Sequence, residues 1–406
     1  MPLVPRVFAA GSLLVLLVAP ASAQTPATPT DSAFDPVKEL VGRLDLERYK
    51  ATIKGLTRFG DRREGTARNR AAIDWIEAQL KSYGCMPTER ITYDVQVPAP
   101  RPATGVGAAT RPRTASTLAQ GGGRIRGNRR STTPVVDSLA QPDATLRALN
   151  SEVPTSGPRQ EVYCTKVGTT RPDEMYIVGG HMDGRGYGEA ANDDGSGTAI
   201  VMELARIFSQ PDVKTDRSIR FILWNNEETG LEGARAYVAQ RQALQGKESP
   251  AGSGKYPEPK WLGMVQHDMM MFDHGMPRAD GTVSPDQRPE ADVNVEFQSN
   301  SKLAAESSKL AWYFSAANEK YGTDYPAAVG QHMTNTDSAP FQDLVPAISL
   351  RENERGAQIG GGWDPQWHQP TDLFSTYNDK DFRLGLNAAQ TTLSAIAMLT
   401  GARLIR

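Results

Sequence analysis

Short apolar runs alternate with longer runs that carry one apolar face, and this alternation constrains the fold more than any other feature of the chain. EMYIVGGH (174–181) is typical of a buried strand, and TAIVMELARIF (198–208) is typical of a helix with one apolar face. Further strand-like runs are SIRFILWNNEE, KWLGMVQHD and VPAISLRE, and further helical runs are GLEGARAYVAQR, SKLAAESSKLAWYFSAANEKY and DKDFRLGLNAAQTTLSAIAMLTG. Strands that alternate with helices form a largely parallel sheet that is covered on both faces. We therefore predict an α/β fold of three layers (α/β/α) around a central mixed, mainly parallel, twisted sheet.

The chain before this pattern adds one helix, one strand and a segment of different character. Residues 69–83 place apolar side chains on one helical face, and Gly84 suits the left-handed position that often ends a helix. The run ERITYDVQV (89–97) alternates like a strand. Residues 97–160 are rich in Pro, Gly, Arg, Ser and Thr, and the part from 95 to 136 contains arginine but no acid. We predict a surface insertion that is partly disordered, with a basic binding arm as the alternative.

The N-terminus, MPLVPRVFAAGSLLVLLVAPASAQTP, has the parts of a signal peptide. Arg6 supplies a positive charge, and residues 7–18 form an apolar stretch. The small residues at 21–23, Ala-Ser-Ala, have the form that signal peptidase accepts. We predict cleavage before Gln24 and export to the periplasm or the outside of the cell, with a short membrane anchor as the alternative.

The composition fits one large domain. The chain has 406 residues, of which 39% are hydrophobic and 23% are charged, and this is enough for a single large core. The formal net charge of -2 gives no reason to expect nucleic acid or an anionic membrane as a partner. We predict a signal peptide at 1–23, a flexible linker rich in Thr, Pro and Ala at 24–40, and one domain at 41–406 that contains the insertion. Once the signal peptide is removed, no contact with a membrane is expected.

The two cysteines, Cys85 and Cys164, leave the question of a disulfide open. An even number of cysteines in an exported chain permits one disulfide. The spacing of the two residues alone does not show that they are close in space. Neither residue lies among the polar clusters described next, so a catalytic thiol is not expected.

Acids and histidines gather just past the ends of the apolar strand runs. These residues are His181, Asp183, Glu227, Glu228 and Asp268, while Asp193 and Asp194 come shortly before the helix at 198–208. In open α/β sheets, ligands bind outside the carboxyl ends of the strands. Side chains from several strand ends are therefore expected to converge on one crevice.

Such a set of side chains points to metal ions. Several carboxylates that meet in one place repel one another, and a divalent cation removes that conflict. Histidines combined with carboxylates suit zinc better than magnesium or calcium. Two metal ions about 3.5–4 Å apart can share one carboxylate and one water, which then loses a proton near neutral pH. The glycines of GGHMDGRGYGEAANDDGSG allow tight turns beside such a site, although an ordinary glycine-rich loop would explain them as well.

The order of the motifs resembles a known family. HxD, NDDGSG, NEETGLEGA, QHDM and WHQPTD follow one another as in the secreted co-catalytic zinc aminopeptidases. That superfamily also includes glutamate carboxypeptidase-like enzymes and glutaminyl cyclases. The resemblance covers roughly residues 45–400, with 97–160 outside it. It implies a zinc-exopeptidase-like fold and two Zn²⁺ ions per chain.

The resemblance also implies which residues hold the metals. His181 and Asp268 match the ligands of one zinc ion, and Glu228 and His368 match those of the other. Asp193, the first acid of NDDGSG, corresponds to the carboxylate that bridges both ions. Each ion would then have one histidine, one terminal carboxylate and the shared Asp193.

Two further residues correspond to catalytic positions of the family. Glu227 resembles the general base that takes a proton from the metal-bound water and passes it to the leaving amine. Asp183 would orient the imidazole of His181. Spacing alone does not separate the role of Glu227 from that of Glu228, although adjacent residues of an extended segment point in opposite directions.

Other polar residues near the motifs are expected to be structural. Asp194 is interpreted as an acid at the start of a helix, and His267 as pointing away from Asp268. His274 and His332 are interpreted as surface histidines of loops, with substrate contact as the alternative. The chain departs from the family in NTDSAPFQDLVPAISL, where Ser338 stands at a position that usually holds histidine. This leaves metal binding untouched and puts substrate specificity in question.

The function predicted from these observations is that of an exported zinc-dependent exopeptidase, most simply an aminopeptidase acting on a peptide or small aminoacyl substrate. Loops at 325–345 and 356–367 would form an apolar pocket, unless their aromatic residues belong to the core. These candidate pocket residues are Tyr325, Met333, Phe341 and Trp363.

Three alternatives stay open. A carboxypeptidase or dipeptidase of the same superfamily would need a basic residue to bind a carboxylate, and Arg185, Arg351 and Arg355 are the candidates. A glutaminyl cyclase would use one metal ion, which fits less well with the pair His181 and His368. An inactive binding module would be expected to have lost ligands, whereas every ligand position is filled here.

Overall fold

The computed structural model describes residues 34–97, 138–273, 292–331, 336–352 and 364–405. Several predictions concern residues outside these ranges. They are the signal peptide at 1–23, most of the linker, the part of the insertion up to residue 137, and the side chains of His274, His332, Met333, Arg355 and Trp363.

An eight-stranded mixed sheet forms the centre of the unit that starts at Pro36. In spatial order its strands are β1 (Thr88–Val95), β2 (Gly157–Lys166), β5 (Arg217–Trp224), β3 (Arg171–His181), β6 (Lys260–His267), β9 (Ala347–Arg351), β7 (Val293–Glu296) and β8 (Ala327–Gly330). The four central strands, β5, β3, β6 and β9, run parallel. Antiparallel pairs join β1 to β2, β2 to β5, and β9 to β7. The predicted mixed, mainly parallel sheet is confirmed.

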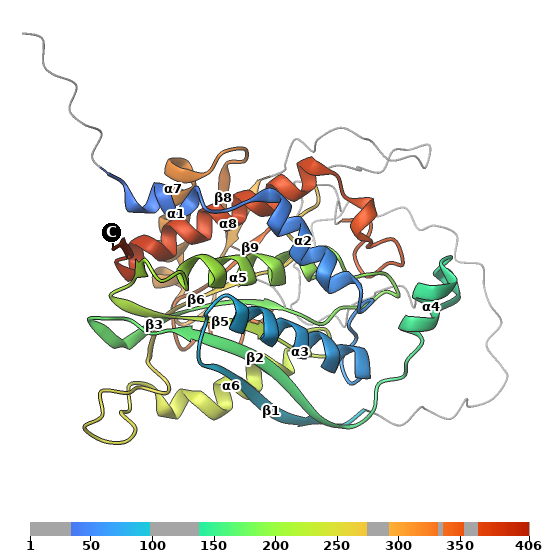
Figure 1. Ribbon diagram of the computed structural model, residues 1–406, viewed down its shortest axis with the longest axis horizontal. Helices are drawn as coiled ribbons and strands as arrows, with labels where there is room; N and C mark the ends of the chain where they lie inside the picture. Colours follow the sequence, from blue (N-terminus) through green and yellow to red (C-terminus); the bar gives the residue numbers. More distant parts are fainter. Residues whose placement is uncertain (1–33, 98–137, 274–291, 332–335, 353–363, 406) are drawn as a thin grey trace, which may run out of the picture. The chain divides into compact units, whose positions relative to one another are not determined.

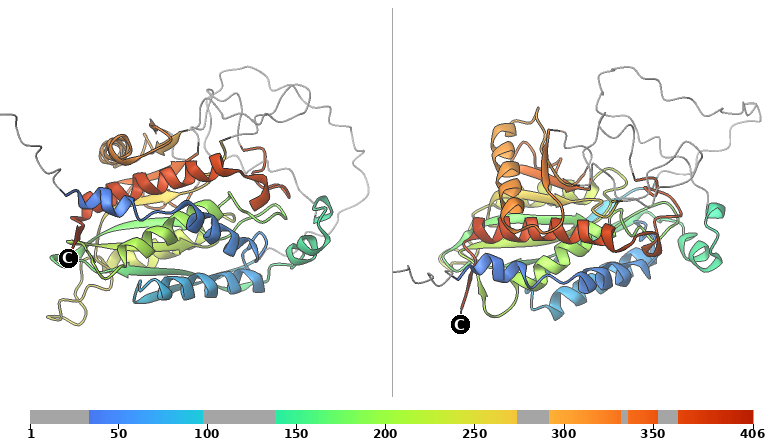
Figure 2. Two further views of the ribbon diagram at one scale, coloured as in Figure 1. Left: turned by 45° about the horizontal axis from the view of Figure 1, so that its top comes forward. Right: turned by 90° about the horizontal axis from the view of Figure 1, so that it is seen from above.

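Helices cover both faces of the sheet, as predicted (Figure 1). One face carries α1 (Pro36–Val41), α2 (Leu46–Thr57), α3 (Ala67–Ser82), α5 (Gly195–Phe208), α7 (Ala304–Tyr321) and α8 (Asp379–Thr400). The other face packs against α6 (Glu232–Arg241). Both views of Figure 2 show that α7 crosses α8 rather than running along it. None of the helices in the described part of the chain is long and apolar enough to cross a bilayer.

Short elements complete the fold. They are η1 (Ser138–Ala140), α4 (Ala144–Asn150), η2 (Gln242–Leu244), η4 (Phe374–Thr376), and a small two-stranded sheet of β4 (Val213–Lys214) and β10 (Arg403–Leu404).

The central strands are buried on both sides, which explains the apolar runs within them. Along β5, Phe221 belongs to the core beneath α5, and its neighbour Ile222 belongs to the core beneath α6. Successive side chains of a strand point to opposite faces, so the residues of such a strand meet a core on either side of the sheet. The sheet is thereby fixed between two cores, and the ends of its strands are held in place.

The start of α5 brings a loop close to the ends of β3 and β6. Asp194 caps this helix, because its side chain accepts a hydrogen bond of 2.9 Å from the backbone N–H of Gly197. A Cβ atom at Gly197 would lie 2.5 Å from the carbonyl oxygen of His267, so only glycine allows this approach. The prediction that Asp194 is a helix-start acid is confirmed.

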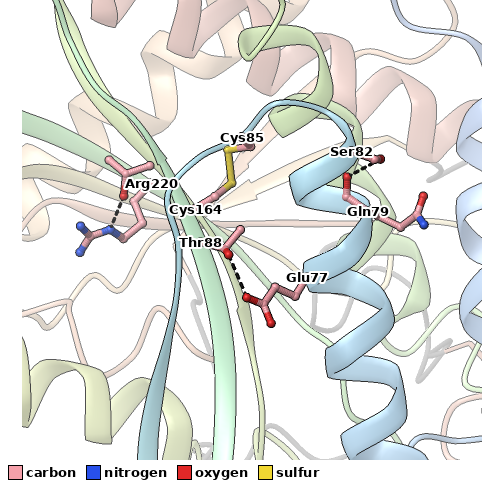
Figure 3. The surroundings of a disulfide bond; sticks show 8 residues. Glu77, Gln79, Ser82, Cys85, Thr88, Cys164 and Arg220 are labelled. Atoms are coloured by element: carbon pink, nitrogen blue, oxygen red, sulfur yellow. Dashed lines mark hydrogen bonds between the residues drawn. A yellow bond between two sulfur atoms is a disulfide. The ribbon is translucent and has the colours of Figure 1, made fainter.

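A disulfide links the two cysteines, whose pairing the sequence leaves open. Cys85 follows α3, Cys164 lies in β2, and their Cα atoms are 5.7 Å apart (Figure 3). Both residues are buried in the core on the face of the sheet that carries α2, α3, α5 and α8. Next to the bond, the hydroxyl of Thr88 donates a hydrogen bond of 2.8 Å to Glu77 of α3.

Two predicted boundaries need correction. The linker was predicted to reach residue 40, but α1 begins at Pro36 and buries Val37 and Leu40. The insertion was predicted to end at residue 160, but η1, α4 and the first residues of β2 lie within it. The sequence ATLRALN after the capping residue Asp143 is a good helix former, and its helical pattern is too short to stand out in a polar segment.

Candidate metal centre

The acids and histidines of the motifs meet at the carboxyl ends of the parallel strands. His181 is the last residue of β3 and pairs with Trp224, the last residue of β5. Asp268 follows β6 directly, and Glu227 follows β5 after two asparagines. Since these strands run parallel, their carboxyl ends lie along one edge of the sheet, as the sequence predicts.

Asp193 lies between the two histidines. Its Oδ1 is 3.4 Å from Nε2 of His181, and its Oδ2 is 3.1 Å from Nε2 of His368. Each histidine also lies near a second acid. Oδ1 of Asp268 is 3.8 Å from Nε2 of His181, and Oε2 of Glu228 is 2.9 Å from Nε2 of His368. Each histidine thus faces one acid of its own, and the two histidines share the carboxylate of Asp193.

Two groups of potential ligand atoms result. Within each group the ligand atoms lie within 4.8 Å of one another; the first group is His181, Glu227 and Asp268, and the second is Asp193, Glu228 and His368. Imidazole nitrogen combined with carboxylate oxygen is a donor set that suits zinc. The side chains are nearly buried, since Asp193 is 4% exposed and His368 is 6% exposed. The residues present therefore fit a pair of zinc ions.

The electrostatics of this cluster favour a cation. Burial lowers the pKa of His368, but the carboxylates of Glu228 and Asp193 outweigh it and raise the value to about 10. Burial acts to raise the pKa of Asp193, but its hydrogen bonds to His181 and His368 bring the pKa below the ordinary range. Both pKa shifts have the same cause, because the carboxylates stabilise positive charge on the neighbouring histidines. A metal ion binds to such ligands by displacing the protons that they share.

Glu227 stands at the same centre as a partly buried carboxylate with an elevated pKa. Burial raises its pKa well above the ordinary value, and the nearby charge of Glu228 adds to this effect. The geometric grouping places Glu227 with His181 and Asp268, whereas the family resemblance separates it from the ligands as the base. Both placements put its carboxylate beside the metal positions, and its role as base stays a prediction.

Asp183 contacts the site by two routes. Its backbone carbonyl oxygen lies 3.0 Å from Nδ1 of His181, while its carboxylate Oδ1 is 3.7 Å from that nitrogen. The imidazole is thus oriented more closely by the main chain of Asp183 than by its side chain. The carboxylate instead accepts backbone N–H groups, from Glu227 at 3.2 Å and from Glu228 at 3.4 Å. The sequence did not predict this second contact.

Several supporting residues lie behind the metal positions. Asp194 accepts backbone N–H groups from His181 at 3.0 Å and from Met269 at 3.2 Å, in addition to capping α5. Asp372 accepts the backbone N–H groups of Asn192 and Asp193 at 2.9 and 3.1 Å. Asp372 closes the motif WHQPTD, so its place in the motif was a signal that sequence reasoning did not use.

Unusual backbone conformations cluster around the centre. Asn226, Met269 and His368 have φ angles of 62°, 59° and 56°, although none of them is glycine. Left-handed residues of this kind are uncommon and often occur at functional sites, where the surrounding structure enforces them. Here they turn the chain directly before Glu227, directly after Asp268, and at a histidine of the cluster itself.

The predicted carboxylate-binding arginines differ in their surroundings. Arg351 is 3% exposed, donates a hydrogen bond of 2.7 Å to Oδ2 of Asp268 and lies 3.7 Å from Glu296. It therefore positions Asp268 and is not available to a substrate. Nε of Arg185 lies 3.7 Å from Oε2 of Glu228, and the Arg185 side chain is 32% exposed.

Residues predicted to lie outside the metal set have clear structural places. His267 points away from the centre, with Nδ1 3.1 Å from the carbonyl oxygen of Gly179 and Nε2 2.8 Å from Oγ1 of Thr392. Ser338 is buried, and its hydroxyl lies 2.7 Å from that of Ser349.

The apolar pocket predicted from Tyr325 and Phe341 is not formed by these two residues. Phe341 packs in the core beneath α6, against Trp224 and Trp261, and Tyr325 belongs to the core on the other face. Aromatic side chains of this size bury most of their surface, so the interior accommodates them better than an open pocket.

Comparison with known proteins identifies the family. The model described as "Peptidase family M28" matches residues 162–391, which is more than half of the chain. The chain belongs to peptidase family M28. The matched range contains all five residues that the sequence predicts as ligands, together with Glu227 and Asp183.

Similarity to individual M28 relatives is local in sequence and extensive in structure. Aminopeptidase YwaD of Bacillus subtilis (strain 168) is 42% identical over 67 residues, which are 16% of this chain and 14% of that protein. Carboxypeptidase Q of Xenopus laevis is 37% identical over 71 residues, which are 18% of this chain and 15% of that protein. The chain spans between 14% and 35% of the length of the curated relatives that it matches.

Among solved structures, a zinc aminopeptidase from Bacillus subtilis superposes with a TM-score of 0.60 at 15% identity. The superposition covers 87% of this chain and 95% of that structure. At this identity the likeness shows the fold and leaves the substrate open.

Proposed function

We propose that the chain is an exported aminopeptidase with two zinc ions, held by His181, Asp193, Glu228, Asp268 and His368. The observation that carries the proposal is the position of Asp193, whose two oxygens face two different histidines at 3.4 and 3.1 Å. A carboxylate with one oxygen for each of two metal positions is what a two-metal site requires. Membership of family M28 supports a hydrolase of this kind.

The bound zinc ions would polarise the carbonyl of the scissile bond and lower the pKa of water. The residues of the chain then handle the protons. Glu227 accepts a proton from the attacking water and donates it to the nitrogen of the leaving amine. A carboxylate whose pKa is raised by burial is suited to both tasks, because it can hold the proton between the two steps. Asp183 keeps Glu227 in place through the hydrogen bond to its backbone N–H.

The charge of the site supports release of the N-terminal residue. Asp183 lies near two further acids, the partly buried Glu227 and the buried Glu64, and burial raises the pKa of Glu64 to about 7. Neither oxygen Oε2 of Glu64 nor Oδ1 of Asp337 has a hydrogen-bond partner among the described residues. Buried acids with free acceptor atoms suit the positively charged α-amine of a peptide. The similarity to both an aminopeptidase and a carboxypeptidase keeps a carboxypeptidase or dipeptidase as the second candidate, which Arg185 favours.

Export is the second part of the proposal. The N-terminal sequence has a charged start, an apolar stretch and a small-residue site before Gln24. The disulfide between Cys85 and Cys164 supports the same conclusion, because disulfides persist in oxidising compartments.

A panel of aminoacyl-arylamides, each with and without an N-acetyl block, tests the function. Hydrolysis of only the free-amine compounds is expected, with activity lost on chelation and restored by zinc. Two zinc ions per chain are expected from metal analysis of the same sample. Equal hydrolysis of blocked and free compounds would contradict an aminopeptidase, and restored activity at one zinc ion per chain would contradict the two-metal site.

A further inference from the structure

Arg185 is a partly exposed cation beside the metal positions, and among the described residues its side chain makes no hydrogen bond. It lies in the loop between β3 and α5, four residues after His181. Its Nε is 3.7 Å from Oε2 of Glu228, and the same oxygen is 2.9 Å from Nε2 of His368. The guanidinium therefore stands next to the second group of ligand atoms.

The hydrogen-bonding capacity of Arg185 is unused by the protein. A guanidinium has five N–H donors in a planar fork. No described residue accepts a hydrogen bond from Arg185, and its Nε is shielded from solvent without an acceptor. About a third of the side chain is exposed, which leaves the outer part of the fork open to a ligand. Arg351 provides the contrast, because Asp268 and Glu296 surround it in the interior.

The loop that carries Arg185 is held firmly on both sides. Asp61 accepts the backbone N–H of Tyr187 at 3.1 Å, and Asn150 donates to the carbonyl oxygen of Gly188 at 2.7 Å. Gly186 has a φ of 99°, and a Cβ atom there would lie 2.5 Å from the carbonyl carbon of His368. The backbone at Arg185 is therefore fixed relative to the metal ligands, so the Arg185 side chain always starts from the same position beside them.

We infer that Arg185 binds the C-terminal carboxylate of the substrate and so selects dipeptides among the peptides that this site hydrolyses. A guanidinium fork matches the two oxygens of a carboxylate and binds them in pairs. The inference rests on the proposed peptidase function and adds the substrate class to it. Arg185 is a binding and positioning residue in this scheme, and the proton transfers stay with Glu227.

The location of Arg185 limits the length of the peptide. The scissile carbonyl has to lie against the ligand groups, and Nε of Arg185 is 3.7 Å from an oxygen of one of them. An extended chain advances roughly 3.3–3.6 Å per residue. A carboxylate one residue beyond the scissile bond is within reach of a group so close to the ligands. Each further residue moves the carboxylate away by the same step.

Arg185 has a simpler alternative role, in which its charge only offsets nearby acids. The acids whose charges act on it are Glu228, Glu64, Asp183 and Glu227. Loss of such a neutralising charge would affect all substrates alike, because it would act through the metal site. Loss of a carboxylate-binding group affects only substrates that carry the carboxylate in the right place. The two roles therefore predict different ratios of kcat/KM between substrates, and total activity does not distinguish them.

The test compares three substrates with one scissile bond type: the dipeptide Leu-Gly, its C-terminal amide, and the tripeptide Leu-Gly-Gly. Leucyl-arylamide, which has no carboxylate, serves as a fourth. For the wild-type protein with zinc, kcat/KM for Leu-Gly is expected to exceed that for the amide and for the tripeptide by about tenfold to a hundredfold. The difference is expected mainly in KM, because the carboxylate contact is present before and during the reaction.

The variant Arg185→Gln is expected to bring the ratio of Leu-Gly to its amide close to one, and Arg185→Lys is expected to keep part of it. Arg171→Gln, at the opposite end of β3, is the matched control and should leave the ratio unchanged. An unchanged ratio in Arg185→Gln overturns the inference, whether or not total activity falls. A wild-type protein that cleaves the arylamide without preferring Leu-Gly also overturns it. No cleavage of any of the four substrates would instead contradict the proposed function.

Discussion

Asp193 reaches His368 with one carboxylate oxygen, Oδ2, which lies 3.1 Å from Nε2 of that ring. Its other oxygen, Oδ1, faces His181 in the same way at 3.4 Å. The two histidines are 187 positions apart in the sequence, and one acid of a loop brings them into a single cluster. Asp372 holds Asp193 in place, because its carboxylate accepts the backbone N–H of Asp193 at 3.1 Å.

Replacement of Asp193 is expected to affect both metal positions. Asp193→Asn offers one oxygen in place of two and should reduce the zinc content toward zero, whereas His368→Ala should remove mainly one ion. Zinc per chain after dialysis against a weak chelator measures both. A variant Asp193→Asn that retains two zinc ions would show that this carboxylate does not bridge them.

Loss of the carboxylate at Glu227 is expected to abolish turnover and to leave zinc in place. General acid–base groups contribute about 10²–10⁴-fold, so kcat of Glu227→Gln should fall by at least a hundredfold. Zinc content and the rate of arylamide hydrolysis are measured on the same preparation. Glu232→Gln, on the surface of α6, is a suitable control. Substantial turnover in Glu227→Gln would remove this residue from the role of base.

Asp183 is expected to act through its neighbours. Its carboxylate holds the backbone N–H groups of Glu227 and Glu228, so Asp183→Ala should displace both acids. Changes of groups that orient metal ligands typically cost 10–100-fold in activity or in metal affinity. We expect a fall in kcat of that size together with weaker zinc binding, measured by competition with a chelator. Asp183→Asn retains one acceptor oxygen and should lie between Asp183→Ala and the wild type.

The disulfide is expected to contribute strongly to stability. It joins residues 79 positions apart, and closing a loop of this length stabilises the folded state by about 4.5 kcal/mol in the chain-entropy description. The double variant Cys85→Ala, Cys164→Ala should therefore unfold at a markedly lower guanidinium concentration. The wild-type protein, unfolded in the presence and absence of a reductant, is the control. Equal midpoints in both conditions would show that the disulfide does not form.

Glu77 is expected to make stability depend on pH below about 4.5. Burial acts to raise its pKa, but hydrogen bonds from Lys81, Arg90 and Thr88 lower the value to about 2. A carboxyl whose pKa is lower in the folded state stabilises the protein above its unfolded pKa, and the contribution disappears as the pH falls through the folded pKa. The difference in unfolding free energy between the wild type and Glu77→Gln should be constant above pH 4.5 and shrink toward pH 2.

Urea unfolding at pH 7, 4.5 and 3 measures this difference for Glu77→Gln. Glu47→Gln, whose acid is exposed on α2, controls for the removal of one surface acid. A difference that does not change between pH 7 and pH 3 would contradict a lowered pKa of Glu77 in the folded protein.

The centre of the fold was predictable because both cores bury the same strands. The runs 175–180 and 221–224 are apolar without interruption, and this pattern occurs in buried parallel strands. The antiparallel edges were not predictable. β7 and β8 have four residues each, which is too short for a periodic signal, and the pairing of β7 with β9 depends on contacts distant in sequence.

The site was predictable to the extent that its acids follow strand ends. His368 is different, because it lies in a loop after β9 and only the motif order linked it to the others. Arg62 gave no signal at all, although its buried guanidinium donates to the carbonyl oxygens of Met182, Glu189 and Ala190. Asn150 was assigned to a surface insertion, yet it holds the loop of Arg185. Such supporting contacts come from single polar residues whose partners only the folded chain reveals.

His181 pairs with Trp224 in the last residue pair between β3 and β5. The cluster of acids and histidines therefore forms only when these two strands are correctly aligned. A shift of β3 by one residue would move His181 by about 3.3 Å and turn it to the opposite face of the sheet. Ligand distances at zinc sites vary by only about 0.2 Å, so a misaligned chain is expected to lose the proposed zinc site and keep its helices and strands. Among molecules with the same circular dichroism spectrum, zinc content would then distinguish the correctly aligned from the misaligned.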